Sequence, residues 1–243
     1  MILPNVRASF GRAEANALLA LLETGDASER ERALDRLRDH GIDALLDDPR
    51  TLNAVLTGDH HVSPGLVFYL LVRHALLESG LDDRTVADYV AALLMEFGRE
   101  DRAYRVAPDT PDRFHYLVDL VAAMDTGDGR RQFMVRAHLG DYALWLSGIF
   151  PDHVTARVQR RGAPGLDYFE AMGASGYRLA ADSPLASRHG LDRLYRTAAD
   201  AFPELRVALN RVADRYLFPE RGDPVGRLLR QISDAFGLDA GHG

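Results

Sequence analysis

Five prolines of this chain directly follow a residue that can cap a helix. An Asp, Ser or Thr side chain accepts hydrogen bonds from the free N–H groups of a first helical turn. Proline suits the next position because its fixed φ is helical and it lacks an N–H that the helix would leave unbonded. The pairs predict helix starts at residues 49, 64, 111, 184 and 224, from Asp48-Pro49, Ser63-Pro64, Thr110-Pro111, Ser183-Pro184 and Asp223-Pro224.

Helical patterns fill most of the chain around these starts. Apolar residues recur at helical spacing, and Gly or Pro ends most of the stretches. No run of β-branched residues alternates with polar ones as a strand would require. We therefore expect an all-α fold, a compact orthogonal bundle of about ten to twelve helices. The expected helices cover 10–24, 28–41, 49–58, 64–80, 83–97, 111–124, 130–149, 152–161, 165–182, 184–201, 203–217 and 224–236.

The connections between these expected helices are short, and no linker is evident. We expect one α-helical domain over residues 1–243, with an N-terminal helical subdomain over residues 1–58 as an option. Softer boundaries are offered by residues 58–63 and 99–110.

Two residue types are missing from the composition, and each absence excludes classes of chemistry. The chain has no cysteine, which excludes disulfides, thiolate nucleophiles and cysteine-ligated metal centres. It has no lysine either, so all 29 basic residues are arginine, and the phosphate-binding lysine of P-loops and Schiff-base catalysis are excluded. The net charge of −7 argues against a nucleic-acid partner, since such proteins carry a basic surface.

No segment of the sequence predicts a signal peptide or a membrane span. Arg7 and Arg12 interrupt the N-terminal residues before an apolar stretch develops. The longest uncharged apolar stretch, residues 142–151, is shorter than the roughly 18 residues that a spanning helix needs. We expect a cytoplasmic protein, with a peripheral position at the inner membrane left open.

Two glycines lie inside an expected helix, in the segment AMGASGYRLA. Gly173 and Gly176 superficially suggest a glycine-rich phosphate loop, but no strand precedes them. Small residues at this spacing are more typical of a helix that another helix approaches closely. We expect that packing role for both glycines.

The charge of the chain reverses locally over residues 130–161, where the only acidic residues are Asp141 and Asp152. Arginine guanidinium groups bind carboxylates and phosphates with two parallel hydrogen bonds. Three of the arginines, Arg157, Arg160 and Arg161, lie at positions i, i+3 and i+4 and so share one face of a helix. This face is either a docking surface or simply exposed to solvent. An aromatic anchor beside them would suit an interface. The predicted partner-binding residues are Arg130, Arg131, Arg136, Trp145, Phe150, Arg157, Arg160 and Arg161.

Histidines and carboxylates also recur at helical spacing, as in His138 and Asp141. Helical bundles can bind metals between such groups. The repeated Glu-x-x-His of di-iron bundles and the HExxH motif are both missing, and each histidine could instead be an ordinary core or surface residue. The candidate ligands are His60, His61, His74, Glu96, His115, His138, Asp141 and Glu170.

The sequence favours a non-catalytic accessory or scaffold subunit, without a cofactor, that docks on other protein subunits through its arginine-rich face. One assembly of this kind is a membrane-bound respiratory or photosynthetic complex, with this chain on its cytoplasmic side. Because no catalytic motif is found, we predict no catalytic residue.

Two alternatives remain open at this level. A helical oxidoreductase would use the histidine and carboxylate set to bind a metal or cofactor. A regulatory domain that senses a small molecule would need an apolar cavity, which a sequence pattern does not reveal.

Overall fold

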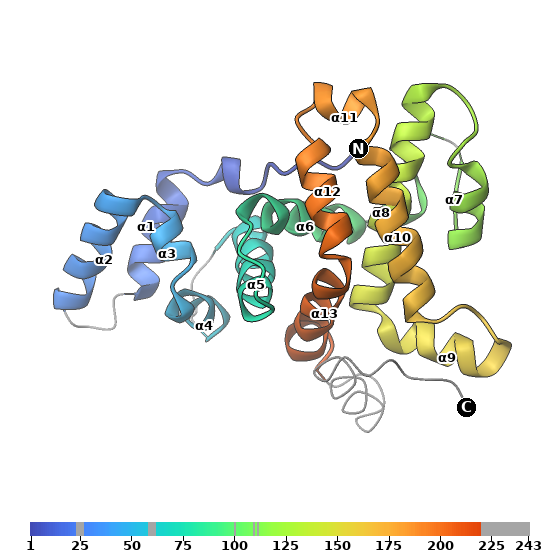
Figure 1. The fold of residues 1–243 in the computed structure, drawn as a ribbon. Helices are drawn as coiled ribbons and strands as arrows, with labels where there is room; N and C mark the ends of the chain where they lie inside the picture. The colour runs from blue at the N-terminus through green and yellow to red at the C-terminus, as the bar shows by residue number, and fades with distance from the viewer. Residues whose placement is uncertain (23–26, 58–61, 100, 109, 111, 220–243) are drawn as a thin grey trace. The chain divides into compact units, whose positions relative to one another are not determined.

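The computed structural model describes residues 1–22, 27–57, 62–99, 101–108, 110 and 112–219 (Figure 1). These residues form thirteen α-helices and no strand, which confirms the expected all-α class. The chain divides into two compact units, an N-terminal unit of residues 2–103 and a C-terminal unit from residue 104 onward. The break falls within the segment 99–110, and the single domain over 1–243 and the subdomain over 1–58 stay predictions.

The N-terminal unit contains six α-helices in its described part. The most buried pair is α5 (Pro64–Glu78) and α6 (Arg84–Phe97), which pack against each other. Residues 86–94 of α6 are all buried, so this helix forms the centre of the unit's core. The remaining helices are α1 (Arg12–Leu22), α2 (Ala27–His40), α3 (Asp43–Leu46) and α4 (Pro49–Thr57).

The C-terminal unit is built around two helices, α8 (Gly129–Ile149) and α10 (Leu166–Ala181), which lie side by side. Figure 1 shows α9 at one end of this pair and α11 at the other. Helix α7 packs on α8, while α12 and α13 pack on α10 and α8. The bounds of these helices are Leu117–Ala123 for α7, Pro151–Arg161 for α9, Pro184–Arg188 for α11, Asp192–Asp200 for α12 and Phe202–Val212 for α13.

Three of the five predicted helix starts are confirmed. Helices α4, α5 and α11 begin at Pro49, Pro64 and Pro184. The residues before them accept hydrogen bonds from N–H groups of the first turn, at 2.9 Å for Asp48 from Arg50, 3.3 Å for Ser63 from Leu66 and 3.3 Å for Ser183 from Leu185. The pair Asp223-Pro224 and the expected helix over 224–236 lie outside the described residues.

The predicted start at Pro111 is wrong, because α7 begins at Leu117. The Thr110 hydroxyl closes a tight turn instead, by donating to the Ala107 carbonyl at 2.8 Å and accepting from the Ala107 amide at 3.2 Å. The amide of Phe114 then donates to the Tyr104 carbonyl at 2.8 Å, and the Phe114 side chain is buried. Tertiary packing therefore holds residues 112–116 in a non-helical path.

Other helix bounds also differ from the expectation. The stretch 184–201 is two helices, because Gly190 adopts a left-handed φ of 66° that ends α11. The stretch 203–217 continues α13 into a π-helical turn over Ala213–Leu217. The short helix α3 has no counterpart among the predicted helices.

Glycines allow α8 and α10 to approach closely, as expected for Gly173 and Gly176. A Cβ atom on Gly176 would lie 2.8 Å from the backbone oxygen of Arg136 on α8. A Cβ atom on Gly173 would overlap the ring of Phe202, and one on Gly140 of α8 would overlap the ring of Tyr177. The close contact between the two helices therefore depends on residues without side chains.

Paired arginines stabilise the N-terminal unit. Arg73 is 1% exposed and forms ion pairs with Asp47 at 2.7 Å and Asp82 at 2.5 Å. Burial disfavours ionisation of Asp47, but Arg73 and Arg84 outweigh it and lower the pKa of that carboxyl. Asp48 binds Arg36 and Arg50, at 2.5 and 2.8 Å.

None of the described helices is both long enough and apolar enough to cross a membrane.

We expect Gly176→Ala to destabilise the C-terminal unit by about 1–3 kcal/mol, because the added methyl group meets backbone atoms of α8 that cannot rotate away. Urea unfolding monitored by Trp145, the only tryptophan, reports on this unit. Gly129→Ala is the control, since its methyl group would have no atom within 4 Å at the start of α8. Equal midpoints for the two variants would contradict the packing role of Gly176.

We expect Asp48→Asn to reduce the free energy of unfolding by about 2 kcal/mol at neutral pH and therefore to lower the thermal midpoint. Burial opposes ionisation of Asp48, but hydrogen bonds from Arg50 and Arg36 outweigh it and hold the pKa of this carboxyl well below its usual range. A carboxyl with a depressed pKa stabilises the fold above its unfolded pKa, and this contribution disappears as the pH falls toward the folded pKa. Thermal unfolding followed by circular dichroism should therefore show a midpoint that is higher for the wild type than for the variant. This difference should be constant above about pH 5 and shrink below about pH 4. A constant advantage down to about pH 2 would contradict this origin.

Candidate functional site

An aromatic cluster fixes the segment before α7 against α8. The ring of Tyr104 lies 4.6 Å from His115 and 6.4 Å from Trp145, measured between centroids. The Tyr142 hydroxyl, on α8, donates a hydrogen bond to the His115 carbonyl at 2.9 Å. Phe150 adds an edge contact with Trp145 at 5.1 Å. This cluster sets the position of the residues from which α7 starts.

The end of α8 is held by a side chain from α13. The Asn210 side-chain amide donates to the carbonyls of Ser147 and Gly148, at 2.8 and 2.7 Å. These carbonyls belong to the last turn of α8, where backbone oxygens lack helical partners. Arg206 donates to Asn210 at 2.9 Å and also pairs with Glu170 of α10. The network fixes the corner from which α9 departs.

The turn from α9 to α10 depends on Gly162. This residue has a left-handed φ of 58°, and its amide donates to the Val158 carbonyl at 2.9 Å. Left-handed backbone favours glycine because other residues pay a steric cost there. The turn brings residues 163–169 back beside α9.

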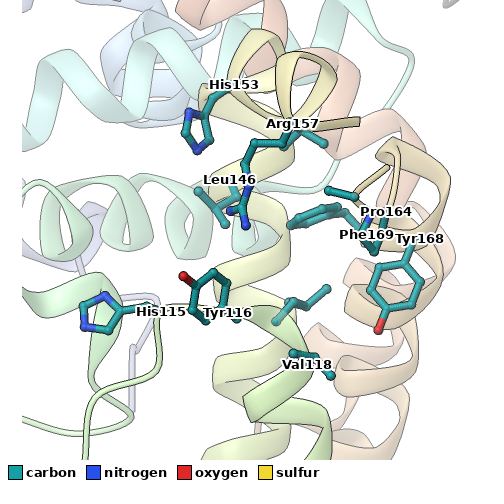
Figure 2. Close-up of a pocket in the computed structure, with 12 residues that line it drawn as sticks. His115, Tyr116, Val118, Leu146, His153, Arg157, Pro164, Tyr168 and Phe169 are labelled. Atoms are coloured by element: carbon teal, nitrogen blue, oxygen red, sulfur yellow. The ribbon is translucent and has the colours of Figure 1, made fainter. Parts of the chain in front are cut away.

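A groove of about 340 Å³ lies between α7, α9 and the start of α10 (Figure 2). Leu117, Leu146, Val154 and Phe169 are among the apolar residues that line it. Leu117 and Val154 are buried, with exposed fractions of 5% and 3%, so they belong to the floor. The volume lies at the lower end of the range of small-molecule sites, about 300–1,000 Å³.

Basic side chains lie at the edge of this groove. His115, His153 and Arg157 line it, and the lining contains neither Asp nor Glu. The Arg157 guanidinium lies 5.4 Å from the centre of the Tyr116 ring, a cation–π contact, and Figure 2 shows the side chain extending from α9 toward this ring. A second hollow of about 360 Å³ shares Tyr116, His153 and Arg157 and adds Arg160.

The apolar edge of the groove is unusually exposed. Tyr116 is 53% exposed and Val118 is 60% exposed, while Val158 on α9 is also exposed. These are the only large apolar side chains that are exposed in the described part of the C-terminal unit. Neither Arg157 nor Arg160 forms an ion pair with a carboxylate of the described residues. Exposed apolar and basic groups thus meet around the groove, where Tyr116 and Val118 lie beside Arg157. We call Tyr116, Val118, Arg157 and Arg160, together with the exposed Val158 of α9, the α7–α9 surface.

The structure separates the predicted partner-binding residues into three groups. Arg130, Arg131 and Arg136 lie in the N-terminal half of α8, where Arg131 pairs with Asp112 at 2.9 Å and Arg136 with Asp125 at 2.7 Å. They lie at the opposite end of α8 from α9, about 20 Å or more along the helix. Trp145 and Phe150 are half-buried in the aromatic cluster. Arg157 and Arg160 lie together on α9; the side chain of Arg161 is outside the described part.

The candidate metal ligands are distributed over both units. His74 and Glu96 belong to the N-terminal unit, whereas His115, His138, Asp141 and Glu170 belong to the C-terminal unit. His60 and His61 fall outside the described residues. Within the described ranges, no group of three or more His, Asp or Glu side chains is arranged to hold a metal ion.

Several of these side chains have clear structural partners. Burial lowers the pKa of His74, and its Nε2 donates to the Leu46 carbonyl at 3.0 Å. Glu96 pairs with Arg99 at 2.7 Å. Asp141, on the same buried helix as His138, accepts from the Tyr177 hydroxyl at 3.0 Å. His74, Glu96 and Asp141 therefore each bind a partner within their own unit of the fold.

Sequence reasoning missed most of the groove. Tyr116, Val118, His153 and Phe169 were not among its candidates, although they line the site. The spacing of His153 and Arg157, four residues apart on α9, was a usable signal because it places both on one helical face. The apolar lining is assembled from four helices, α7, α8, α9 and α10, and no pattern within one helix predicts it.

Comparison of the chain with protein-family models, curated proteins and solved structures gives no match. The candidate site therefore depends on geometry and chemistry alone.

We expect Tyr142→Phe to destabilise the C-terminal unit by about 1 kcal/mol, because it removes the hydrogen bond to the His115 carbonyl. Urea unfolding followed by Trp145 fluorescence measures the change. Tyr168→Phe is the matched control, since the Tyr168 hydroxyl forms no hydrogen bond with a described residue. The same loss in both variants would show that the bond to His115 contributes nothing specific.

Proposed function

We propose that this chain is a non-catalytic helical accessory subunit that docks on other protein subunits through the α7–α9 surface. The observation that supports the proposal is that Arg157 and Arg160, which pair with no carboxylate of the described residues, lie beside exposed apolar side chains on that surface. Interfaces are enriched in aromatic residues and arginine around a desolvated centre. Tyr116 and Val118 would supply this centre, with Arg157 and Arg160 as its basic edge.

The proposal also defines the charge of the partner surface. Arg157 and Arg160 have guanidinium groups that carboxylates can bind with two parallel hydrogen bonds. Arg157 is half-buried and Arg160 is exposed, whereas buried arginines such as Arg73 and Arg206 already bind an Asp or Glu. Carboxylates on an acidic partner surface would form ion pairs with Arg157 and Arg160 of α9. A membrane-bound complex as the assembly stays a sequence-level prediction.

We expect simultaneous charge reversal of Arg157, Arg160 and Arg161 to Glu to abolish the complex, with a loss of at least about 2–5 kcal/mol of binding free energy. The tagged chain is purified from its source cells in native form, and co-purifying proteins are quantified by mass spectrometry. The partner should be present in stoichiometric amount with the wild type and absent with the triple variant.

The matched control reverses Arg188 and Arg193, two exposed arginines beyond the other end of α10. This variant should retain the partner, because it changes the net charge without changing the α7–α9 surface. A photo-crosslinking residue at position 118 should in addition form its covalent product with the same partner. A complex that survives the triple reversal, or is lost equally in the control, counts against the proposal.

A further inference from the structure

We propose that the groove between α7, α9 and α10 binds a small amphipathic carboxylate, with its apolar body on Leu146 and Phe169 and its carboxylate on Arg157. This inference goes beyond the docking function, because the ligand is a free small molecule and its binding needs no partner protein. It would make the α7–α9 surface responsive to a metabolite.

The shape and lining of the groove suit an apolar body. Its walls are side chains of α7, α8, α9 and α10, and the buried residues Leu117 and Val154 contribute to them. Sites of this kind are mostly apolar and contain a few polar groups that orient the ligand. At about 30 Å³ for each water-sized group, a volume of 340 Å³ admits about eleven groups. A chain of about ten carbons or a small aromatic body has this size.

The charges at the groove suit an anionic head group. Arg157 reaches into the groove from α9, and Tyr116 lies against its guanidinium at 5.4 Å from the ring centre. No Asp or Glu lines the groove; Asp119, Asp152 and Asp167 lie on the same helices but outside the lining. His115 and His153 also line the groove (Figure 2), but the His115 ring packs on Tyr104, at 4.6 Å between centroids. A neutral or cationic ligand would leave the basic edge without a counter-charge.

Carboxylate geometry favours Arg157 as the anchor over the two histidines. The guanidinium fork forms two parallel hydrogen bonds with a carboxylate and is charged at every physiological pH. None of the carboxylates of the described residues pairs with it, so a ligand need not displace an internal partner. Its contact with the Tyr116 ring also restricts the orientation of the fork before any ligand arrives.

The test is isothermal titration calorimetry of the full chain with decanoate at about pH 7, at concentrations up to about 5 mM. We expect saturable binding of one decanoate, with decanol and acetate each weaker by about tenfold or more, because each lacks one half of the recognition. Arg157→Met, which keeps an apolar stem and removes the charge, should weaken decanoate binding by about tenfold or more.

Two substitutions of Val118, to Glu and to Arg, distinguish the effect of charge on decanoate binding from the effect of losing the valine side chain. This position is 60% exposed on the edge of the groove, so both substitutions should fold, which circular dichroism and Trp145 fluorescence verify. Val118→Glu should bind decanoate about tenfold or more weakly than Val118→Arg does. The two variants lose the same valine and differ in the sign of the new charge.

Four results would overturn the inference: no saturable heat with decanoate, equal affinity for decanol, unchanged affinity in Arg157→Met, or binding to phosphatidylglycerol vesicles without binding of free decanoate. The last result would assign the surface to a membrane. A wild-type chain that binds a protein partner and loses it on charge reversal, but binds no decanoate, would refute this inference alone. A chain that binds decanoate without any protein partner would refute only the docking function.

Discussion

The close contact between α8 and α10 is the constraint on which the C-terminal unit depends. Gly140, Gly173 and Gly176 leave no room for a side chain at this contact, because Tyr177, Phe202 and the α8 backbone already occupy the space. Once the two helices are this close, their ends are fixed relative to each other. The turn at Gly162 then only has to join α9 to α10 over a short distance, and the groove forms beside that turn. The candidate site is therefore a product of helix packing several turns away from it.

The arginines of this chain have two different uses. In the N-terminal unit, four arginines form ion pairs with aspartates within the unit and stabilise its fold: Arg36, Arg50, Arg73 and Arg84. In the C-terminal unit, Arg206 and Arg136 serve the same purpose, whereas Arg157 and Arg160 remain directed at the α7–α9 surface. In a chain without lysine, a net charge or an arginine count does not distinguish these two uses. Only the position of the matching carboxylates does so.

Sequence reasoning recovered the fold class and most helix starts, because capping and proline chemistry act within a single turn of backbone. It failed at Thr110-Pro111, where the same local signal was overridden by the hydrogen bond from Phe114 to Tyr104 and by burial of the Phe114 ring. The close approach at Gly173 and Gly176 was predictable, since a residue without a side chain has few other reasons to lie within a helix. The groove was not predictable. Its lining joins Leu117, Leu146 and Phe169 from three helices, and no local pattern records which faces of separate helices will meet.

The bond between Asn210 and the last turn of α8 has a consequence for the order of events during synthesis. The carbonyls of Ser147 and Gly148 leave the ribosome about sixty residues before the amide that binds them, so these two bonds form only after Asn210 has emerged and α13 has packed. A nascent chain that ends before residue 210 therefore lacks the bonds that hold the corner from which α9 departs. If the proposed docking function holds, a partner would bind this surface only after α13 has packed.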